Sequence, residues 1–568
     1  MILQALYEYY KRCNNLPKKG TELKEIGYLI VIDYSGEFIR LESRMIDKKR
    51  ASLYLVAQTV QRSGRKFIGN FLWDNCEYVT GYSDKNKDKA LMCKNAFVER
   101  VKEIKNKLPK NQVINAVSCF YQKYPCVFDV LKDDALWNEM SASTKNISFL
   151  IQGCTSIAAT DEEIIYIAGN QSDGEDLHTC LVTGFKGQTA RIHSKVPLQG
   201  NAFTSLVSFK DGKGYDSYGK EQGANAPISE EAEFAYTTAL NHLLRSDSRN
   251  KFLIGNRTFL FWASKDDEAG KQAEESIFNM FGFTEQEDDP NRNIEQVRKT
   301  FNAIYSGSLK TSLEDKFYIL GLAPNSARIA VTYWSELPLK DFAALILRHF
   351  KDMEIVDTRK EKKPYSGLYS ILKSVTLDGI ISGEKSKLQP NLPDAVVKSI
   401  FQGVPYPYTL FSGCLRRIRA EQSINITRAA ILKAYLNRLQ SDNHKLIKDM
   451  DKENTNQGYL CGRLFAVLDK IQDEANNQHS IRERYMNSAS STPAAVFATI
   501  LNLSYHHSEK LNEGRKVWFE KIKREIVDKI SPDGFPAHLD LQDQGRFFVG
   551  YYQQTQLFYT KKEEQTEQ

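Results

Sequence analysis

Two segments of the chain combine basic residues, amides and glycines in a pattern that suits contact with nucleic acid. Residues 62–75 read RSGRKFIGNFLWDN, and residues 217–227 read SYGKEQGANAP. Lysine and arginine neutralise phosphates, amide side chains can donate to and accept from one base edge, and glycine permits close backbone approach. We therefore predict that these segments read and bind DNA through a set of polar side chains: Arg65, Lys66, Asn70, Asn75, Ser217, Lys220, Gln222 and Asn225.

The same residue types also occur in turns, where amide side chains cap backbone groups. For Asn70 and Gln222 this structural interpretation stays open beside the base-reading one. If these amides do read bases, Lys66 and Lys220 would hold the neighbouring phosphates, because phosphate contacts position a protein and base contacts specify the sequence. For the apolar run 71–73 we favour burial in the core over insertion between bases.

Positive charge is concentrated in two parts of the chain, although the net charge is only +6. Residues 44–66 hold seven bases and one acid, and residues 398–448 hold nine bases and two acids. Concentrated positive charge is typical of a protein that binds a polyanion, and the alternative is a set of solvated helix faces. The predicted phosphate-binding residues are Lys48, Lys49, Arg50, Lys210, Lys213, Arg416, Arg417, Arg419 and Arg428.

One stretch resembles the phosphate-binding loop of nucleotide hydrolases. Gly214–Lys220 fits the pattern GxxxxGK. The next residue should be Ser or Thr to bind magnesium, but it is Glu221, and Gly223 and Pro227 then interrupt the helix that should follow. We therefore expect no nucleotide hydrolysis, although such a glycine loop can still bring backbone N–H groups close to phosphates.

Candidate metal ligands are sparse. The spacing of His178, Cys180 and His193 fits no common metal site. Acidic clusters at 161–163 and 173–176 leave a metal-dependent nuclease acting on DNA as the alternative function, because such sites draw carboxylates from several elements. Loop acids are the simpler interpretation, and we expect no catalytic residue, no metal and no cofactor.

The elements that carry these residues change in character along the chain. Up to residue 335, β-branched and aromatic runs alternate with glycine-rich loops, which indicates a mixed α/β region. We predict a helix at Glu231–Leu244 and an acidic surface connection at Asp266–Asp289. The predicted strands are Tyr28–Asp33, Glu163–Gly169, Ala202–Phe209, Thr258–Ala263 and Arg328–Trp334.

After Pro338, apolar residues recur every three or four positions, which is typical of packed helices. The expected fold class is α+β, with a mixed α/β domain followed by an all-helical C-terminal bundle. We predict three domains: the mixed domain at 1–335, a basic helical domain at 336–449 and a C-terminal helical bundle at 450–568. The polar stretch 441–458 reads as a hinge between the last two.

The composition excludes several classes of protein. No apolar run approaches the ~18 residues that a membrane span needs, and the opening residues lack the pattern of a signal peptide. Nine cysteines are scattered without a CxxC pair, which argues for a reducing compartment. We therefore expect a cytoplasmic protein with no membrane contact.

Several segments together resemble one family over nearly the whole chain. These segments are the opening MILQALYEYY, NFLWDN at 70–75, CLVTG at 180–184, SYGKEQGANAP at 217–227, LGLAPNSAR at 320–328, PYP at 405–407 with RRIR at 416–419, GRLFAVLDK at 462–470 and QGRFFVGYYQQ at 544–554. In these segments the chain is similar to the large subunit of the type I-C CRISPR surveillance complex, called Cascade.

The resemblance implies a non-catalytic, crRNA-guided role in antiviral defence. Such a subunit recognises the PAM, a short motif that flanks the target, on double-stranded DNA. It also helps to unwind target DNA for R-loop formation and supports recruitment of the helicase-nuclease. The implied partners are crRNA, target DNA, the backbone subunits, the guide-handle-binding subunit and the small subunit. The family also implies an internal start for the small subunit, and Met450 is the better candidate because it opens the predicted C-terminal bundle.

Overall fold

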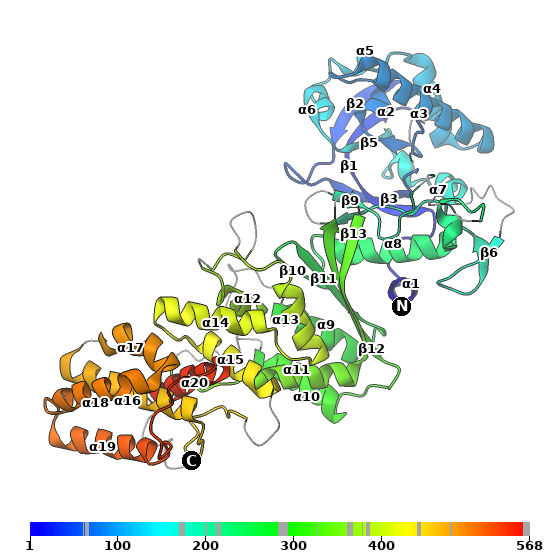
Figure 1. The fold of residues 1–568 in the computed structure, drawn as a ribbon. Coiled ribbons are helices and arrows are strands. Elements are labelled where there is room, and N and C mark those ends of the chain that lie inside the picture. The colour runs from blue at the N-terminus through cyan, green and yellow to red at the C-terminus, as the bar shows by residue number, and fades with distance from the viewer. Residues whose placement is uncertain are drawn as a thin grey trace. The chain divides into compact units, whose positions relative to one another are not determined.

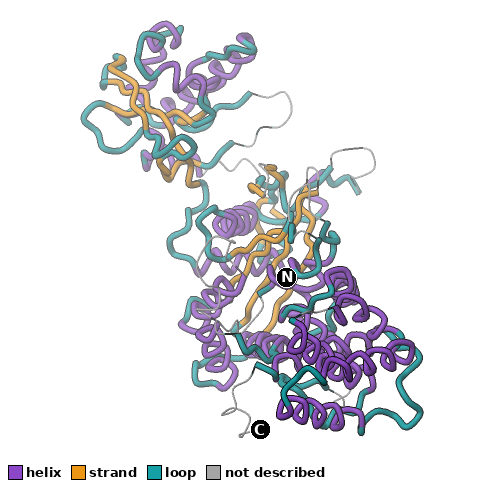
Figure 2. Tube along the Cα trace, turned by 90° about the vertical axis from the view of Figure 1, so that its left-hand side faces the viewer, coloured by secondary structure: helices purple, strands orange, loops and turns teal. Residues whose placement is uncertain are grey.

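The chain forms two compact units in the computed structural model (Figure 1). Unit 1 contains most of residues 1–242, and unit 2 contains residues 243–568 together with 197–204. Figure 2 shows that strands and helices mix in the first part of the chain, whereas the last part is made of helices alone. The structure describes residues 1–60, 62, 67–169, 177–198, 202–210, 212, 216, 218–281, 294–325, 328–359, 367–377, 379–381, 387–439, 445–477 and 480–559.

The first sheet of unit 1 is built around one long strand. Its strands are β1 (Thr21–Ile32), β2 (Phe38–Ser43), β3 (Ser52–Ala57), β4 (Trp73–Asp74) and β5 (Asn146–Ile151). Strand β5 runs parallel to β1, and β4 pairs antiparallel with β5. Strand β2 pairs antiparallel with residues 28–32 of β1, and β3 pairs antiparallel with residues 21–26. The chain between β2 and β3 therefore leaves the sheet as a short loop.

This loop, residues 45–51, is closed at its base. Met45 and Ala51 form an isolated β-bridge, and the backbone N–H of Ile46 donates to the carbonyl of Arg50 at 2.8 Å. Gly27 lies beside it in β1, where a Cβ atom would be 2.6 Å from Cβ of Lys145. Only glycine fits at that position, so the close packing there holds the base of the loop in place.

Strand β1 is buried on both faces, under helices on one side and under residues 157–159 on the other. Tyr28, Ile30 and Ile32 pack against helical residues such as Phe97 and Phe120, while Leu29 and Val31 pack on the other side, against Ile157 and Ala159. The helices of this part are α2 (Cys76–Thr80), α3 (Lys87–Lys107), α4 (Gln112–Lys123), α5 (Val127–Leu131) and α6 (Trp137–Ala142).

The rest of unit 1 is more irregular. It contains α1 (Ile2–Arg12), α7 (Glu162–Gly169), the hairpin β6 (Leu177–Thr179) and β7 (Lys186–Gln188), the 3-10 turn η2 (Gln222–Asn225) and α8 (Glu230–Leu244). The predicted helix at 231–244 is confirmed as α8. The predicted strand at 163–169 is wrong, because the Asp161 carboxylate accepts from the backbone N–H groups of Glu163 and Ile164 and caps a helix there.

The sheet of unit 2 is an antiparallel meander in the order β10-β11-β12-β13. The predicted strands at 258–263 and 328–334 are confirmed within β11 and β13, whereas the one predicted at 202–209 is limited to β9 (Ala202–Thr204), which pairs with β8 (Val196–Leu198). The bounds of the meander are β10 (Lys251–Ile254), β11 (Arg257–Ala263), β12 (Lys316–Asn325) and β13 (Arg328–Pro338).

Helices pack on this meander through one aromatic face. Phe259, Phe261 and Phe317 belong to the same buried cluster as helical residues of α9 (Glu268–Phe281), α10 (Ile294–Ser306), α11 (Leu339–Met353) and α13 (Leu392–Gln402). The prediction of a surface connection at 266–289 is therefore wrong over α9, whose Ala269, Ala273 and Ile277 are buried. Residues 282–289 lie outside the described residues.

The remainder of unit 2 is helical, which confirms the α+β fold class with a helical C-terminal part. These helices are α12 (Leu368–Lys373), α14 (Tyr408–Glu421), α15 (Ile426–Leu439), α16 (Gln457–Asn476), α17 (Ser480–Ser491), α18 (Pro493–Ser508), α19 (Glu513–Val527) and α20 (Leu541–Leu557). The predicted boundary at 335 lies inside β13. None of the helices in the described ranges is long and apolar enough to cross a membrane.

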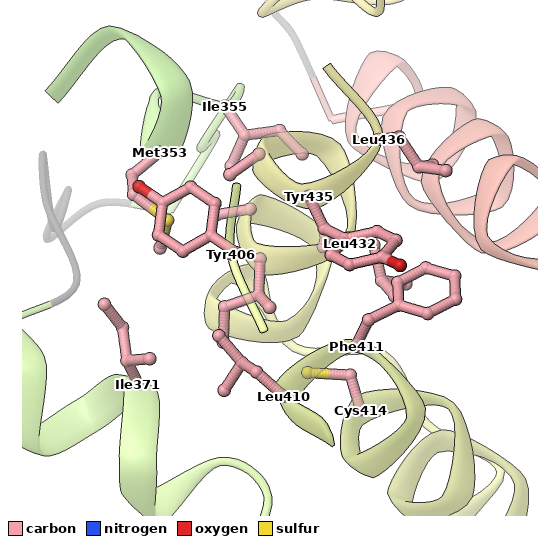
Figure 3. Packing of buried hydrophobic residues seen from close by; sticks show 14 of the residues in the cluster. Met353, Ile355, Ile371, Tyr406, Leu410, Phe411, Cys414, Leu432, Tyr435 and Leu436 are labelled. Atoms are coloured by element: carbon pink, nitrogen blue, oxygen red, sulfur yellow. The ribbon is translucent and has the colours of Figure 1, made fainter. Parts of the chain in front are cut away.

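The closest helix contact in unit 2 is between α16 and α20. A Cβ atom on Gly462 would be 1.9 Å from the carbonyl oxygen of Phe547, and one on Gly550 would be 2.4 Å from that of Tyr459. Helix α20 also packs on α14 and α15, because a Cβ atom on Gly545 would be 2.8 Å from the ring of Phe411 and 3.3 Å from Leu436. The rings of Phe411 and Tyr435 stack at 4.3 Å between centroids and join α14 to α15 (Figure 3). Helix α20 therefore joins the C-terminal helices to those before them.

Candidate nucleic-acid interface

The loop 45–51 presents two lysines to solvent. Oδ1 of Asp47 accepts from the backbone N–H groups of Lys49 (2.8 Å) and Arg50 (2.9 Å), and Oδ2 accepts from Nε of Arg50 at 2.7 Å. These bonds lower the pKa of Asp47 to about 2, so its carboxylate stays charged and neutralises Arg50. The side chains of Lys48 and Lys49 are exposed and have no ion-pair partner among the described residues. Ile46, at the same tip, is 66% exposed.

The segment 62–75 places its amides inside the fold. Asn70 is 2% exposed, and its Oδ1 accepts from the backbone N–H of Val60 at 3.0 Å. Asn75 caps α2, because its Oδ1 accepts from the backbone N–H of Tyr78 at 3.2 Å. These are the positions of turn-holding amides, so the expectation that Asn70 faces a base is at odds with its burial. The predicted burial of the run 71–73 is confirmed.

The described basic residue of this segment is also engaged. Arg62 forms an ion pair with the buried carboxylate of Asp74, donates from Nε to the carbonyl of Ile68 at 2.8 Å and lies over the ring of Tyr78 at 3.8 Å. Burial raises the pKa of Asp74, and the Arg62 guanidinium opposes this rise. Arg65 and Lys66 lie outside the described residues.

The loop 218–225 is held in place by contacts with residues 190 and 191. A Cβ atom on Gly223 would be 2.1 Å from the carbonyl oxygen of Ala190, and the backbone N–H of Gly223 donates to the carbonyl of Arg191 at 3.1 Å. Nη1 of Arg191 donates to Oε1 of Gln222 at 2.9 Å. Nδ2 of Asn225 donates to the carbonyls of Lys220 (3.2 Å) and Gln222 (3.1 Å), so Asn225 holds the turn.

The outer side of this loop is fully exposed. Tyr218 is 101% exposed, Lys220 is exposed, and Lys220 has no ion-pair partner in the described ranges. The prediction from the sequence names only polar residues here, although an aromatic residue next to glycine and lysine is typical of base stacking. Lys210 is exposed as well, whereas Ser217 and Lys213 lie outside the described residues.

Two of the predicted phosphate-binding arginines in unit 2 bind a carboxylate instead. Nε of Arg417 and Nη2 of Arg428 each donate to Oε1 of Glu421 at 3.0 Å, and Nε of Arg428 donates to the carbonyl of Ser374 at 2.9 Å. Arg428 is 5% exposed. The predicted contact of Arg428 with a phosphate is at odds with this burial. Its charge is neutralised instead by Glu421 of the preceding helix, α14.

The other two arginines of α14 remain available. Arg416 is exposed and Arg419 is half-buried, and neither side chain has an ion-pair partner in the part of the chain that the structure describes. The middle of α17 lies beside the end of α14, because Nδ2 of Asn487 donates to the carbonyl of Arg419 at 3.3 Å. Arg484, one turn earlier on α17, is exposed and has no described ion-pair partner either. Arg484 is not among the predicted residues, because only tertiary packing brings it near α14.

The described ranges contain no candidate metal site, because nowhere in them do three His, Cys, Asp or Glu side chains come together. Nδ1 of His193 is 2.6 Å from the hydroxyl of Tyr236. Burial lowers the pKa of His193 to about 4. Burial opposes ionisation of Cys180, but hydrogen bonds, those from Ser229 first, lower its pKa to about 7. Asp161 caps α7, and the predicted acidic cluster at 173–176 lies outside the described residues.

The residues on either side of Met450 form hydrogen bonds with neighbouring helices. Nδ2 of Asn437 donates to the carbonyl of Leu446 at 2.7 Å, and Nε2 of Gln553 donates to the carbonyl of Lys448 at 3.0 Å. The backbone N–H of Asp451 donates to the hydroxyl of Tyr459 at 3.0 Å. Residues 445–456 are therefore attached to α15 and α20, while residues 441–444 of the predicted hinge lie outside the described residues.

Comparison with known proteins gives one clear result. A family model described as CRISPR-associated protein (Cas_Csd1) matches residues 6–559, which is nearly the whole chain. The chain has no significant match among curated proteins.

Proposed function

Because the chain belongs to the Cas_Csd1 family of CRISPR-associated proteins, the large subunits of type I-C surveillance complexes, we propose that it recognises the PAM on double-stranded DNA and helps to open the duplex. In RNA-guided recognition the guide reads the target by base pairing, and the protein reads only the short flanking motif. The observation that best supports this role is the fixed loop 218–225, which holds Gln222 and Lys220 at the surface.

Gln222 is the strongest candidate for reading a base. Its amide oxygen accepts from Arg191, and its amide nitrogen has no partner among the described residues. An amide N–H can donate to an acceptor on a base edge, and in the major groove the positions of these acceptors differ from one base pair to another. Since Gly223 fixes the backbone, this donor would be held in place before DNA arrives, which lowers the entropic cost of binding.

Lysines near this loop and on the loop 45–51 suit phosphates rather than bases. Lys220, Lys48 and Lys49 are exposed and lack ion-pair partners in the described ranges, so their charges are free to neutralise a DNA backbone. Arg65, Lys66, Lys213 and Ser217 stay in the proposal as residues of the same two segments.

In unit 2 we assign backbone contacts to three arginines, Arg416, Arg419 and Arg484, which would track an opened strand and favour the R-loop. The helical part would also support recruitment of the helicase-nuclease. The other proposed partners are crRNA, the backbone subunits, the guide-handle-binding subunit and a small subunit translated from Met450, all in the cytoplasm.

The test uses the assembled complex and a pool of target duplexes whose flanking bases are randomised. The wild-type complex should enrich a short flanking motif. Gln222→Ala should reduce the preference for that motif about 2- to 10-fold, because a single hydrogen bond contributes about 0.5–1.5 kcal/mol. Lys220→Ala should weaken binding to all flanks alike and lower the salt slope by about one unit.

Two results would overturn the proposal. Equal binding of all flanking sequences by the wild-type complex would make the chain a scaffold that only bridges other subunits. Magnesium-dependent cleavage of DNA by the chain alone would instead support the nuclease alternative. The melting temperature of each variant serves as the control for folding.

A further inference from the structure

The side chain of Tyr218 has no structural role that explains its position. Its ring is 101% exposed, so it buries no apolar surface and contributes nothing to the core. Its backbone φ is 53°, in the left-handed region that a residue with a large side chain rarely adopts. Strain of this kind persists where the surrounding structure enforces it, and it gathers at binding sites.

The surrounding loop does enforce this conformation. Gly219 and Gln222 also have positive φ values, 71° and 43°. The turn is fixed by the contact of Gly223 with the Ala190 carbonyl. A rigid turn therefore projects an aromatic ring into solvent, so the ring is already oriented when a ligand arrives and binding loses less conformational entropy.

The charges near the ring indicate the chemistry of that ligand. Lys220 follows two residues later, and it is exposed without a described ion-pair partner. Arg191 is exposed beneath the turn and donates to Gln222 from Nη1. A ring flanked by cations suits an unpaired nucleotide, in which a flat base stacks on the ring and a phosphate meets the charge.

We propose that Tyr218 stacks on an unpaired nucleobase at the point where the duplex is opened. The proposal rests on the proposed function and deepens it, because it separates holding an opened base from reading a paired one. Stacking accepts any base, so Tyr218 would not contribute to the choice of flanking motif. Its effect would appear only when a base has left the helix.

The experiment uses the full-length chain and two DNA duplexes of one sequence, which both contain 2-aminopurine. One duplex is fully paired, and the other carries a two-nucleotide bubble at the probe. The wild-type chain should bind the bubble more tightly and quench the probe there. Tyr218→Asn should weaken bubble binding about 5- to 150-fold and abolish the quenching, while affinity for the paired duplex stays unchanged.

The choice of variants keeps folding out of the comparison. Asparagine tolerates a left-handed backbone, so Tyr218→Asn should keep the wild-type melting temperature. Tyr218→Phe keeps the ring and should retain the bubble preference. Tyr505→Asn replaces another tyrosine, 61% exposed on α18, and should change nothing.

Each failure has its own meaning. If Tyr218→Asn keeps both the bubble preference and the quenching, the stacking role is wrong while the proposed function stands. Equal binding of both duplexes by the wild-type chain also overturns the stacking role alone, and leaves a protein partner as the ligand of the ring. If the wild-type chain binds neither duplex, the proposed function and the stacking role fail together.

Discussion

The buried guanidinium of Arg428, at the start of α15, forms an ion pair with the partly exposed carboxylate of Glu421, at the end of α14. The pair closes the connection between two neighbouring helices. The pKa of Glu421 is lowered, first by its bond to Arg428, so the acid stays charged at neutral pH. Arg428 therefore adds to the positive charge counted in the sequence, but in the fold it stabilises the contact between two helices.

Replacing Arg428 should therefore damage stability rather than DNA binding. Breaking a fully buried pair costs about 3–5 kcal/mol, and because Glu421 is partly exposed we expect about 2 kcal/mol for Arg428→Ala. Arg416→Ala is the matched variant, since that side chain is exposed. It should leave thermal unfolding unchanged and lower the salt slope of DNA binding by about one unit. A lowered salt slope in folded Arg428→Ala would contradict this assignment.

Asn70 offers a second contrast, with Gln222. Asn70→Ala removes the acceptor of the Val60 N–H, which should cost about 1–2 kcal/mol and lower the melting temperature. Gln222→Ala removes a surface contact and should leave melting nearly unchanged. The preference for the flanking motif should be reduced in Gln222→Ala and unchanged in Asn70→Ala. Unchanged melting of Asn70→Ala together with lost motif preference would restore Asn70 as a reader.

Acid should weaken unit 2 through His349. This histidine is fully buried, its Nδ1 is 2.6 Å from the hydroxyl of Tyr406, and burial together with nearby Arg438 lowers its pKa to about 3. An unfolded chain binds the proton near pH ~6.5, so the unfolded state gains protons first as pH falls. Stability is full above that pH and should fall by about 2 kcal/mol between pH 7 and 5.

The measurement is urea unfolding at several pH values. His349→Gln should show a flatter pH dependence than the wild type, because its side chain cannot take up a proton. The exposed His506 provides the control, and His506→Gln should follow the wild-type curve. If His349→Gln follows it too, then burial of the imidazole does not cause the acid sensitivity.

Met450 can be tested by expression alone. Leucine is close to methionine in size, so Met450→Leu should leave the full-length fold intact. If translation also starts at this codon, a product of residues 450–568 should disappear from the gel while the full-length chain remains. Persistence of the short product in Met450→Leu would exclude this codon as its start.

The sequence predicts elements well where one pattern of residues dominates. Apolar spacing in 231–244 predicts helix α8, and the aromatic and β-branched run 258–263 predicts strand β11. The run at 163–169 is apolar in a way that strands and helices share, and the Asp161 cap decides for a helix. In 266–289 the acidic composition obscures the four-residue spacing of Ala269, Ala273 and Ile277, which buries one face of α9.

Site residues are harder to predict, because charge counts ignore partners. Arg417 and Arg428 look like Arg416 and Arg419 in a charge count. The i,i+4 spacing of Arg417 and Glu421 on one helix is readable from the sequence, whereas only packing shows that Arg428 meets Glu421. Arg484 joins this surface from a helix about 65 residues further along the chain. Exposure of an aromatic ring, as at Tyr218, depends on how the turn folds.

The loop 45–51 leaves the sheet between two strands that both pair with β1, and its base is closed by the bridge between Met45 and Ala51. Insertions or deletions at its tip therefore need not shift the register of any strand. A change of length or charge at this tip would therefore alter only what the tip touches. If Lys48 and Lys49 hold a DNA backbone as proposed, such changes would tune the affinity for DNA while the fold stays as it is.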